Sequence, residues 1–280
     1  MKFAITTDTH VHFLRDPEAQ VRAFRDEIYQ KHPQAFLHLG DIGEGQQFFN
    51  PAYQAMVEDS LYVLGNHDLW RRNYQTPPLA MNSTLKMLGG TPLETKWEDT
   101  KTIKKIKDCT FVGSIGFPDF KHPALKDFEP EFWELNPRTN DTRFIDITAG
   151  WLAYTIPLQN AFFKRLRKAF KEDTKSIVIA THYPILSQQT KMNMSYEEKQ
   201  IWPFFFNWTI GQYVLKLAEN HIDKKVFVLS GHSHEYCSGR VDQILDNLFC
   251  YGMTAEYDIL RYKLLDTDWD FQTLQKELND

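Results

Sequence analysis

The segment KFAITTDTH, residues 2–10, places a short strand-like run directly before an Asp-x-His pair. The run Lys2–Thr7 is nearly continuously apolar up to its two threonines, which suits a β-strand that is covered on both faces. Alternate side chains of an extended segment point the same way, so Asp8 and His10 can face one pocket. This segment therefore predicts a buried strand that carries two metal-binding residue types at its carboxyl end.

Four further apolar runs have the same arrangement. They are Ala35–Leu39, Leu61–Leu64, Ser176–Ala180 and Val226–Ser230. The residues that follow them are, in order, Gly40-Asp41, Gly65-Asn66-His67-Asp68, His182 and Gly231-His232-Ser233-His234. Ligand sites of open α/β sheets collect at the carboxyl ends of the strands, so we expect the five segments to contribute to one site. Glycine before Asp41, Asn66 and His232 permits tight turns where the chain leaves the sheet.

Helical patterns separate several of these runs, which indicates a layered α/β fold. We predict helices over Pro17–Lys31, over Ala149–Phe170 with a division at Pro157, and over Tyr196–Asn220 with a break near Pro203. Additional strands, expected to form hairpins in mixed sheets, are predicted over Thr102–Lys107, Thr110–Ser114, Gln243–Cys250 and Ile259–Leu265. Residues 71–100 and 117–140 show no strong periodicity and are expected to be insertions that shape the rim of the site. Without a linker or repeat, residues 1–280 are expected to form a single domain.

Composition excludes several classes of protein. A net charge of −5 and a pI near 6.1 give no overall attraction to nucleic acid or to an anionic membrane. No apolar stretch approaches the roughly 18 to 20 residues of a membrane span, and the N-terminal run is too short for a signal peptide. The few cysteines, Cys109, Cys237 and Cys250, indicate free thiols in a reducing compartment. We therefore expect a cytoplasmic protein.

Seven side chains are candidate metal ligands, and their number fits a pair of ions. They are Asp8, His10, Asp41, Asn66, His182, His232 and His234. A bridging Asp41 would fill eight positions, or four for each ion, and would leave room for hydroxide and substrate. Mixed carboxylate and imidazole ligands suit manganese, iron, zinc, cobalt or nickel, of which we favour Mn²⁺. Two divalent ions and two aspartates leave a local charge of +2, which attracts an anion.

Taken together, these motifs resemble those of the calcineurin-like metallophosphoesterase superfamily. Five segments match in the family order between residues 8 and 234: Asp8-Thr9-His10, Gly40-Asp41, Gly65-Asn66-His67-Asp68, Thr181-His182 and Gly231-His232-Ser233-His234. The resemblance implies a four-layer α/β/β/α sandwich with two mixed sheets packed face to face. It also implies that Asp8, His10, Asp41 and His234 hold one ion, and that Asp41, Asn66, His182 and His232 hold the other.

The activity implied is hydrolysis of a phosphate mono- or diester by a hydroxide that two ions share. Ions roughly 3.5–4 Å apart can deprotonate such a water at neutral pH. By resemblance, His67 would stabilise the transition state or protonate the leaving oxygen. Glu44 would hold His67 in place, with Asp68 as the competing candidate. His12, Arg71 and Arg72 are candidate substrate contacts, since an arginine can clamp phosphate.

The substrate is not specified by these residues. We expect a small phosphate ester such as a nucleotide. The continuation Ile42-Gly43-Glu44-Gly45 lacks the arginine of phosphoprotein phosphatases, and no tyrosine stands where purple acid phosphatases place a ligand. Cyclic-nucleotide phosphodiesterases remain a close fit. A nuclease of the superfamily and a catalytically inactive scaffold that binds protein partners are the alternatives, although every ligand of the set is present here.

Several other residues have a structural and a functional interpretation. For His38, inside a strand run, we favour a hydrogen-bonded core histidine. The aromatic stretch Trp202–Trp208 could stack a nucleobase, but such a run is more often packing. Asp119 and His122 lie in an insertion that could reach the cleft.

Overall fold

The computed structural model describes residues 1–45, 50–70, 76–96, 98–123, 151–191 and 205–279. Its strands are β1 Lys2–Thr6, β2 Ala35–His38, β3 Leu61–Tyr62, β4 Thr91–Pro92, β5 Lys104–Ile106, β6 Cys109–Ser114, β7 Ser176–Thr181, β8 Lys225–Ser230, β9 Val241–Leu245, β10 Leu248–Gly252 and β11 Lys263–Asp266. Its α-helices are α1 Pro17–Gln30, α2 Pro51–Val57, α3 Pro77–Leu88, α5 Trp151–Lys171, α7 Trp208–Glu219 and α8 Phe271–Asn279.

The strands form two mixed sheets. One sheet has the order β11-β1-β2-β3-β4 and the other the order β5-β6-β7-β8-β10-β9. The neighbours β1–β2, β2–β3, β6–β7 and β7–β8 are parallel, whereas β11, β5 and β9 pair antiparallel at the edges. The carboxyl ends of β1, β2 and β3 therefore lie together in one sheet, and those of β7 and β8 lie together in the other.

Side chains alternate between two apolar layers along the central strands. In β1, Phe3 and Ile5 pack between the sheets, while Ala4 faces the helices. In β7, Val178 packs between the sheets, while Ile177 faces the helices of the second sheet. Burial on both faces is what makes these strands continuously apolar in sequence.

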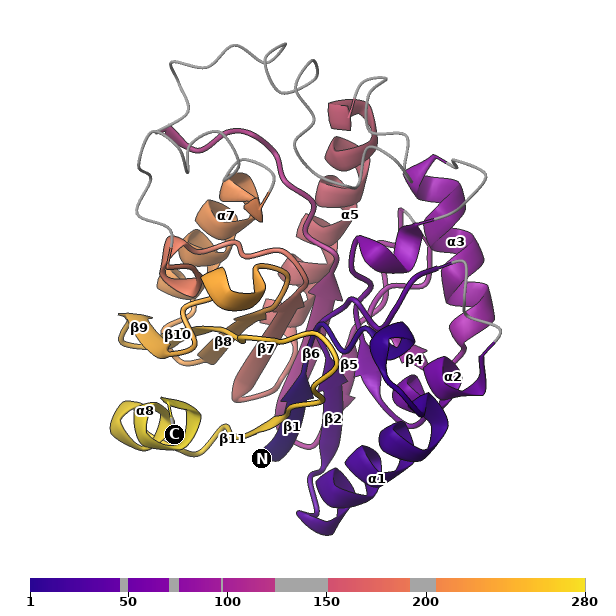
Figure 1. The fold of residues 1–280 in the computed structure, drawn as a ribbon. Helices are drawn as coiled ribbons and strands as arrows, with labels where there is room; N and C mark the ends of the chain where they lie inside the picture. The colour runs from indigo at the N-terminus through magenta and orange to yellow at the C-terminus, as the bar shows by residue number, and fades with distance from the viewer. Residues whose placement is uncertain (46–49, 71–75, 97, 124–150, 192–204, 280) are drawn as a thin grey trace.

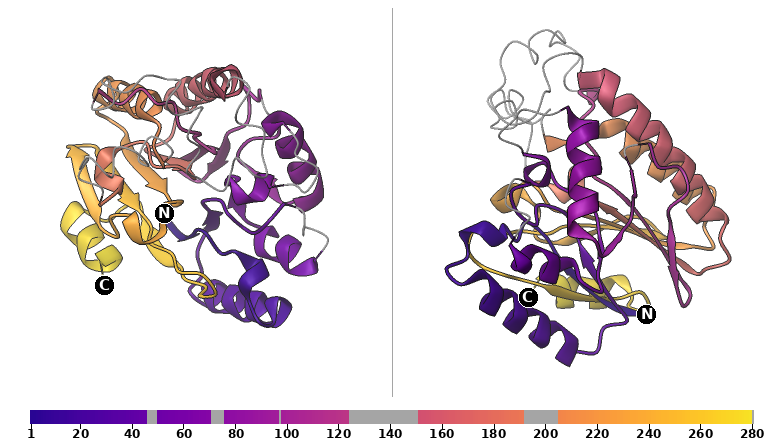
Figure 2. Two further views of the ribbon diagram at one scale, coloured as in Figure 1. Left: turned by 45° about the horizontal axis from the view of Figure 1, so that its top comes forward. Right: turned by 90° about the vertical axis from the view of Figure 1, so that its right-hand side faces the viewer.

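Helices cover the outer face of each sheet, as Figures 1 and 2 show. Residues of α1, α2 and α3 pack on the first sheet, and residues of α5 and α7 pack on the second. The order helix, sheet, sheet, helix confirms the predicted four-layer α/β/β/α sandwich. Both chain termini lie at the lower end of the molecule in Figure 1, away from the carboxyl end of β1.

The predicted division of the fifth helix at Pro157 is wrong, because α5 runs unbroken from Trp151 to Lys171. Proline removes one backbone hydrogen bond and crowds the preceding turn, a cost of about 3 kcal/mol in a helix interior. Pro157 lies only two turns from the helix start. The buried face that follows it, with Leu158, Phe162 and Leu166, outweighs that cost.

Residues 71–100, in which the sequence shows no strong periodicity, include regular structure. Helix α3 occupies Pro77–Leu88 and β4 follows at Thr91–Pro92. The helix starts with proline at its first position, ends before Gly89, and buries Met81, Leu85 and Leu88. Prolines and small polar residues hid this buried stripe in the sequence. Residues 71–75, 97 and 124–150 lie outside the described part of the chain.

Other boundaries differ from prediction. The segment 243–250 contains two strands, β9 and β10, which pair across a turn at Asp246-Asn247. Helix α7 begins only at Trp208, where the Asn207 side chain accepts a hydrogen bond from the Ile210 N–H. Residues 192–204, which include Pro203, lie outside the described residues. Helices α2 and α8 were not predicted.

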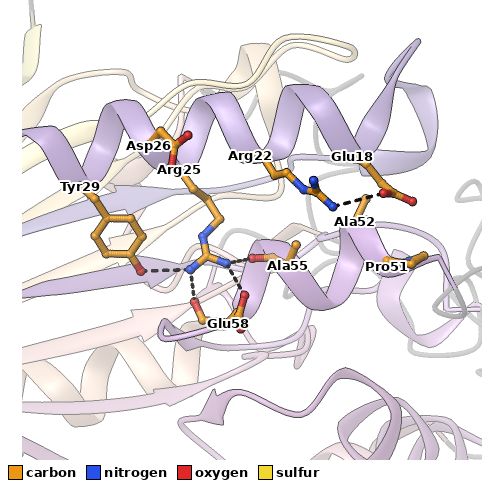
Figure 3. A pocket seen from close by; sticks show the side chains of 9 residues that line it. All are labelled: Glu18, Arg22, Arg25, Asp26, Tyr29, Pro51, Ala52, Ala55 and Glu58. Atoms are coloured by element: carbon orange, nitrogen blue, oxygen red, sulfur yellow. Dashed lines mark hydrogen bonds and ion pairs between the residues drawn. The ribbon is translucent and has the colours of Figure 1, made fainter.

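A cleft of about 410 Å³ lies between α1 and α2, as Figure 3 shows. Its lining includes both arginines of α1, and each has an acceptor. Arg25 donates to the Ala55 and Glu58 carbonyls and forms an ion pair with the Glu58 carboxylate at 3.4 Å. Arg22 lies 3.5 Å from Glu18. The cleft thus contains polar contacts between α1 and α2, and both of its arginines already have acidic partners.

Candidate metal centre

The candidate ligands follow the carboxyl ends of strands in both sheets. Five of them have left-handed backbone: φ is 48° at Asp8, 39° at His10, 54° at Asp41, 72° at His232 and 46° at His234. Non-glycine residues rarely adopt this conformation, which costs of order 1–3 kcal/mol and clusters at functional sites. The strained loops come from both sheets, and their side chains approach one another in the groups described next.

The first group of candidate ligands consists of Asp8, His10 and His234. One Asp8 oxygen, Oδ2, accepts from the Thr7 hydroxyl at 2.5 Å and from the His232 N–H at 2.9 Å. The other, Oδ1, lies 3.4 Å from His234 Nε2. The Nε2 atoms of His10 and His234 are 3.4 Å apart. One carboxylate oxygen is thus held in place while the other faces the two imidazoles.

The second group combines Asp41, His182 and His232. Asn66 Oδ1 lies 2.9 Å from His182 Nε2 and 3.0 Å from His232 Nδ1, and the two ring nitrogens are 3.1 Å apart. The Asp41 Oδ2 atom lies 3.4 Å from His182 Nε2. These four side chains meet at one point, from the four loops that follow β2, β3, β7 and β8.

Asp41 connects the two groups. Its Oδ1 accepts the His67 backbone N–H at 2.9 Å. Its Oδ2 lies 3.4 Å from His182 Nε2 and 3.8 Å from His10 Nε2. The free oxygen therefore faces imidazoles of both groups, which is the position that a bridging ligand requires.

The distances and the unpartnered atoms of the site fit a pair of metal ions. Two ligand atoms at about 2.0–2.1 Å from a shared ion lie about 2.9–3.4 Å from each other. The pairs within each group have such distances, whereas Asp41 Oδ2 and His10 Nε2 are farther apart, at 3.8 Å. Three further site atoms, Asp8 Oδ1, His10 Nδ1 and His234 Nδ1, are buried without a hydrogen-bond partner among the described residues. Buried polar atoms without partners are costly, and an ion would give Asp8 Oδ1 one.

Groups outside the ligand set orient the ligands. His182 Nδ1 lies 2.9 Å from the Leu39 carbonyl, which leaves Nε2 for a metal. His38 is fully buried, with Nε2 2.9 Å from the Thr9 hydroxyl and Nδ1 accepting the Gly40 N–H at 3.2 Å. Burial lowers the pKa of His38 to about 3. His38 is therefore the neutral, hydrogen-bonded core histidine that was predicted.

Asp68 ties two of the ligand loops together. Its carboxylate accepts the Gly43 N–H at 3.0 Å and the Gly65 N–H at 2.8 Å. Burial, followed by the charge of Asp41, raises the pKa of Asp68 to about 8. These bonds fix the relative position of the loops that carry Asp41 and Asn66.

The pKa values of the candidate histidines indicate which rings are neutral and can coordinate a metal. Burial holds the pKa values of His10 and His232 well below the usual range, so both rings are neutral and can coordinate. Burial also acts to lower the pKa of His182, but the Asp41 carboxylate prevails and raises it to about 9. An ion bound at His182 would therefore displace a proton.

Gly65 offers a test of how closely the site is built. A methyl group at this position would lie 2.0 Å from Asp41 Oδ1 and 2.4 Å from the Asp41 backbone nitrogen. We expect Gly65→Ala to lower metal affinity by about 10- to 100-fold and stability by about 1–3 kcal/mol. Titration calorimetry and thermal unfolding measure both. Gly89→Ala adds its methyl group to open space, but Gly89 has a φ of +69°, at which alanine strains the backbone. This variant therefore controls for a loss of stability alone, and equal metal affinity of both variants would contradict the close approach.

His67 stands beside the two ligand groups, and it forms a third set of possible ligands with His10 and Asp41. Its Nε2 lies 3.9 Å from Asp41 Oδ2, its ring stacks on Trp70 with centroids 3.6 Å apart, and its side chain is 16% exposed. Its Nδ1 has no hydrogen-bond partner among the described residues. The Glu44 carboxylate lies 3.8 Å from His12 Nε2, so the role of Glu44 in holding His67 stays a prediction.

The remaining predicted residues divide into three outcomes. His12 is buried close to the site, with its ring 5.6 Å from that of His10. Arg71 and Arg72 lie outside the described residues. Asp119 caps α7, where it accepts the Trp208 and Thr209 N–H groups, and His122 packs on Trp208.

Two half-exposed aromatic residues at the site were missed, as was the buried Tyr183, whose ring lies 3.9 Å from that of His232. Phe13 contacts His12 with ring centroids 4.1 Å apart, and Tyr257 stacks on His234 at 4.6 Å. The position of Phe13, three residues after His10, was a signal that could have been used. Tyr257 lies 23 residues after His234 in no recognisable motif, so its place is visible only in the structure.

A family model described as calcineurin-like phosphoesterase matches residues 1–236. This chain is a member of the calcineurin-like phosphoesterase family. The family consists of metal-dependent phosphoesterases, and in this member the aspartate and histidine groups above are able to hold metal. Comparison with curated proteins found no matching sequence.

Solved structures align with this calcineurin-like phosphoesterase at low sequence identity. A dimetal phosphatase from Danio rerio aligns with a TM-score of 0.52 at 13% identity, over 94% of this chain and 91% of that one. A 5'-nucleotidase from Candida albicans aligns with a TM-score of 0.44 at 14% identity, over 98% of this chain and 49% of that one. An NAD nucleotidase from Haemophilus influenzae aligns with a TM-score of 0.45 at 11% identity, over 94% of this chain and 46% of that one. The chain thus spans about half the length of the two nucleotidases.

None of the helices in the described ranges combines the length and apolarity needed to span a bilayer.

Proposed function

We propose that this chain is a dinuclear metal-dependent hydrolase of a small phosphate mono- or diester, such as a nucleotide. The observation that carries the proposal is the position of Asp41 Oδ2, which faces His182 of one ligand group and His10 of the other. Asp8, His10, Asp41 and His234 would hold one ion, and Asp41, Asn66, His182 and His232 the other. We favour Mn²⁺, with iron, zinc, cobalt and nickel as alternatives.

When bound, two divalent ions supply an activated water and neutralise charge on the phosphoryl oxygens. The protein contributes position and charge. Its two ligand carboxylates, Asp8 and Asp41, leave the loaded site with a local charge of about +2, which attracts a phosphate. His67 lies at the rim of the cluster and would donate a proton to the leaving oxygen, while His12, Arg71 and Arg72 would contact the substrate.

The test measures metal content and turnover together. We expect protein dialysed against Mn²⁺ to bind two ions per chain and to hydrolyse bis-p-nitrophenyl phosphate or p-nitrophenyl phosphate, whose ratio gives the diester or monoester preference. His182→Ala should lose metal and activity. His221→Ala replaces a histidine at the end of α7, outside both groups, and should retain them. Two bound ions without turnover of either ester would favour the scaffold function instead.

A further inference from the structure

Two half-exposed aromatic side chains stand next to the candidate metal centre and have no part in the function proposed so far. Phe13 is 50% exposed and Tyr257 is 49% exposed. Their ring centroids are 5.2 Å apart and their planes meet at 78°. Because the two rings are nearly perpendicular, they form an L-shaped aromatic surface that is open to solvent.

This surface is continuous with the first group of metal ligands. The Tyr257 ring stacks on His234 with centroids 4.6 Å apart and planes 28° apart, and lies 4.9 Å from His10. The Phe13 ring also lies near His10, with the two ring centroids 6.0 Å apart. A phosphate held at these ligands would therefore bring the organic group esterified to it within reach of both rings.

The backbone holds the two rings in place. Phe13 ends a short 3-10 helix in which its N–H donates to the His10 carbonyl at 2.8 Å, and the Val11 N–H donates to Ile42 at 2.9 Å. Tyr257 lies in a tight turn that the Glu256–Ile259 bridge closes. In Figure 1 the gold segment between β10 and β11, which contains this turn, crosses in front of the sheets.

The turn is also anchored to the strand that leads into the site. The Thr6 hydroxyl donates to the Arg261 carbonyl at 2.6 Å, and Thr6 precedes Asp8 by two residues. Arg261 pairs with Glu256 across the base of the turn. Because both segments are fixed to loops that carry metal ligands, binding a flat group requires little reorganisation.

We propose that Phe13 and Tyr257 form a platform for the planar aromatic part, an aryl group or a nucleobase, of the phosphate ester. The proposal rests on the proposed function and names the substrate class for the same site. Aromatic side chains bind such groups by stacking, which tolerates different ring systems because each presents a π-face. An aliphatic ester of equal charge would gain nothing from the platform, and this difference makes the proposal testable.

The experiment compares aromatic with aliphatic substrates on the full, Mn²⁺-loaded chain. The substrates are adenosine 5'-monophosphate, p-nitrophenyl phosphate and glycerol 2-phosphate. We expect Phe13→Ala and Tyr257→Ala each to raise KM about tenfold for the aromatic esters and less than about twofold for glycerol 2-phosphate. Tyr257→Phe keeps the ring and should behave as the wild type. Ile259→Ala, at an exposed apolar position of the same turn, is the matched control.

Two outcomes would overturn the platform. The first is an equal loss on all three esters with reduced metal content, which would make Tyr257 a support for His10 and His234. The second is no change on any ester. A change confined to p-nitrophenyl phosphate would assign the platform to an aryl group, and one confined to adenosine 5'-monophosphate would assign it to a nucleobase.

Failure of the proposed function can be distinguished from failure of the platform. If the loaded wild type hydrolyses none of the esters, saturation-transfer NMR with adenosine 5'-monophosphate on the chain loaded with diamagnetic Zn²⁺ still tests the platform through binding. We expect the purine protons to receive more saturation than the ribose protons in the wild type, and this excess to disappear in the double variant Phe13→Ala, Tyr257→Ala. Equal excess in both proteins would refute the platform regardless of catalysis.

Discussion

Replacing Asp41 with alanine is expected to remove both ions and to lower kcat/KM for p-nitrophenyl phosphate or its diester by more than about 10³-fold. Loss of a group that only supports a metal ligand already costs about 10- to 100-fold. Asp41 would be shared by both ions, and its Oδ1 also accepts the His67 N–H. Its loss therefore affects both ions and the loop of the proposed acid at once.

Metal analysis beside the kinetic assay separates these effects. Asp41→Asn keeps the shape and the acceptor for the His67 N–H but removes the charge, and we expect it to retain fewer than two ions. Asp26→Asn, on the exposed face of α1, is the control for a lost carboxylate. Two retained ions and normal turnover in Asp41→Ala would contradict the bridging role.

Replacing His67 with alanine is expected to lower kcat by about 10²- to 10⁴-fold while both ions stay bound. The ring lies at the edge of the cluster, 16% exposed, with Nε2 3.9 Å from Asp41 Oδ2. It can therefore reach a leaving oxygen without being required as a ligand. Metal content and kcat are measured on the same preparation.

The effect of a general acid depends on the leaving group of the ester. A p-nitrophenolate leaves without protonation, whereas an alkoxide needs a proton, so a general acid matters most for alkyl esters. We expect the loss in His67→Ala to be larger for glycerol 2-phosphate than for p-nitrophenyl phosphate. An equal loss on both esters would assign His67 to charge stabilisation, and loss of metal would make it a ligand.

The central strands and the candidate ligands were predictable because their signals are local. Burial on both faces requires unbroken apolar runs, and β1, β7 and β8 show them. Polar residues directly after such runs mark the strand ends, so the positions of Asp8, Asp41 and His182 follow from the sequence. Parallel pairing then brings the ends of β1 and β2 together, and the packing of the two sheets brings the end of β7 to them.

Features that depend on tertiary packing were not predictable. Pro157 is tolerated in α5 because the helix has a long buried face, and the sequence around the proline does not show how well that face packs. The contact between Glu44 and His12 depends on how two loops cross. Tyr257 reaches His234 through a turn between β10 and β11. The position of this turn depends on the pairing of β11 with β1 and on the bond from Thr6 to the Arg261 carbonyl.

The division of the ligands between the two sheets has a consequence for the stability of the whole molecule. Asp8, Asp41 and Asn66 follow strands of one sheet, whereas His182, His232 and His234 follow strands of the other. Each ion of the proposed pair would take ligands from both, and would act as a crosslink across the upper end of the sandwich. Because binding would favour only the folded chain, each ion present at 1,000 times its dissociation constant would stabilise the protein by about 4 kcal/mol. Divalent metal would thus hold the two sheets of the protein together in addition to its role in catalysis.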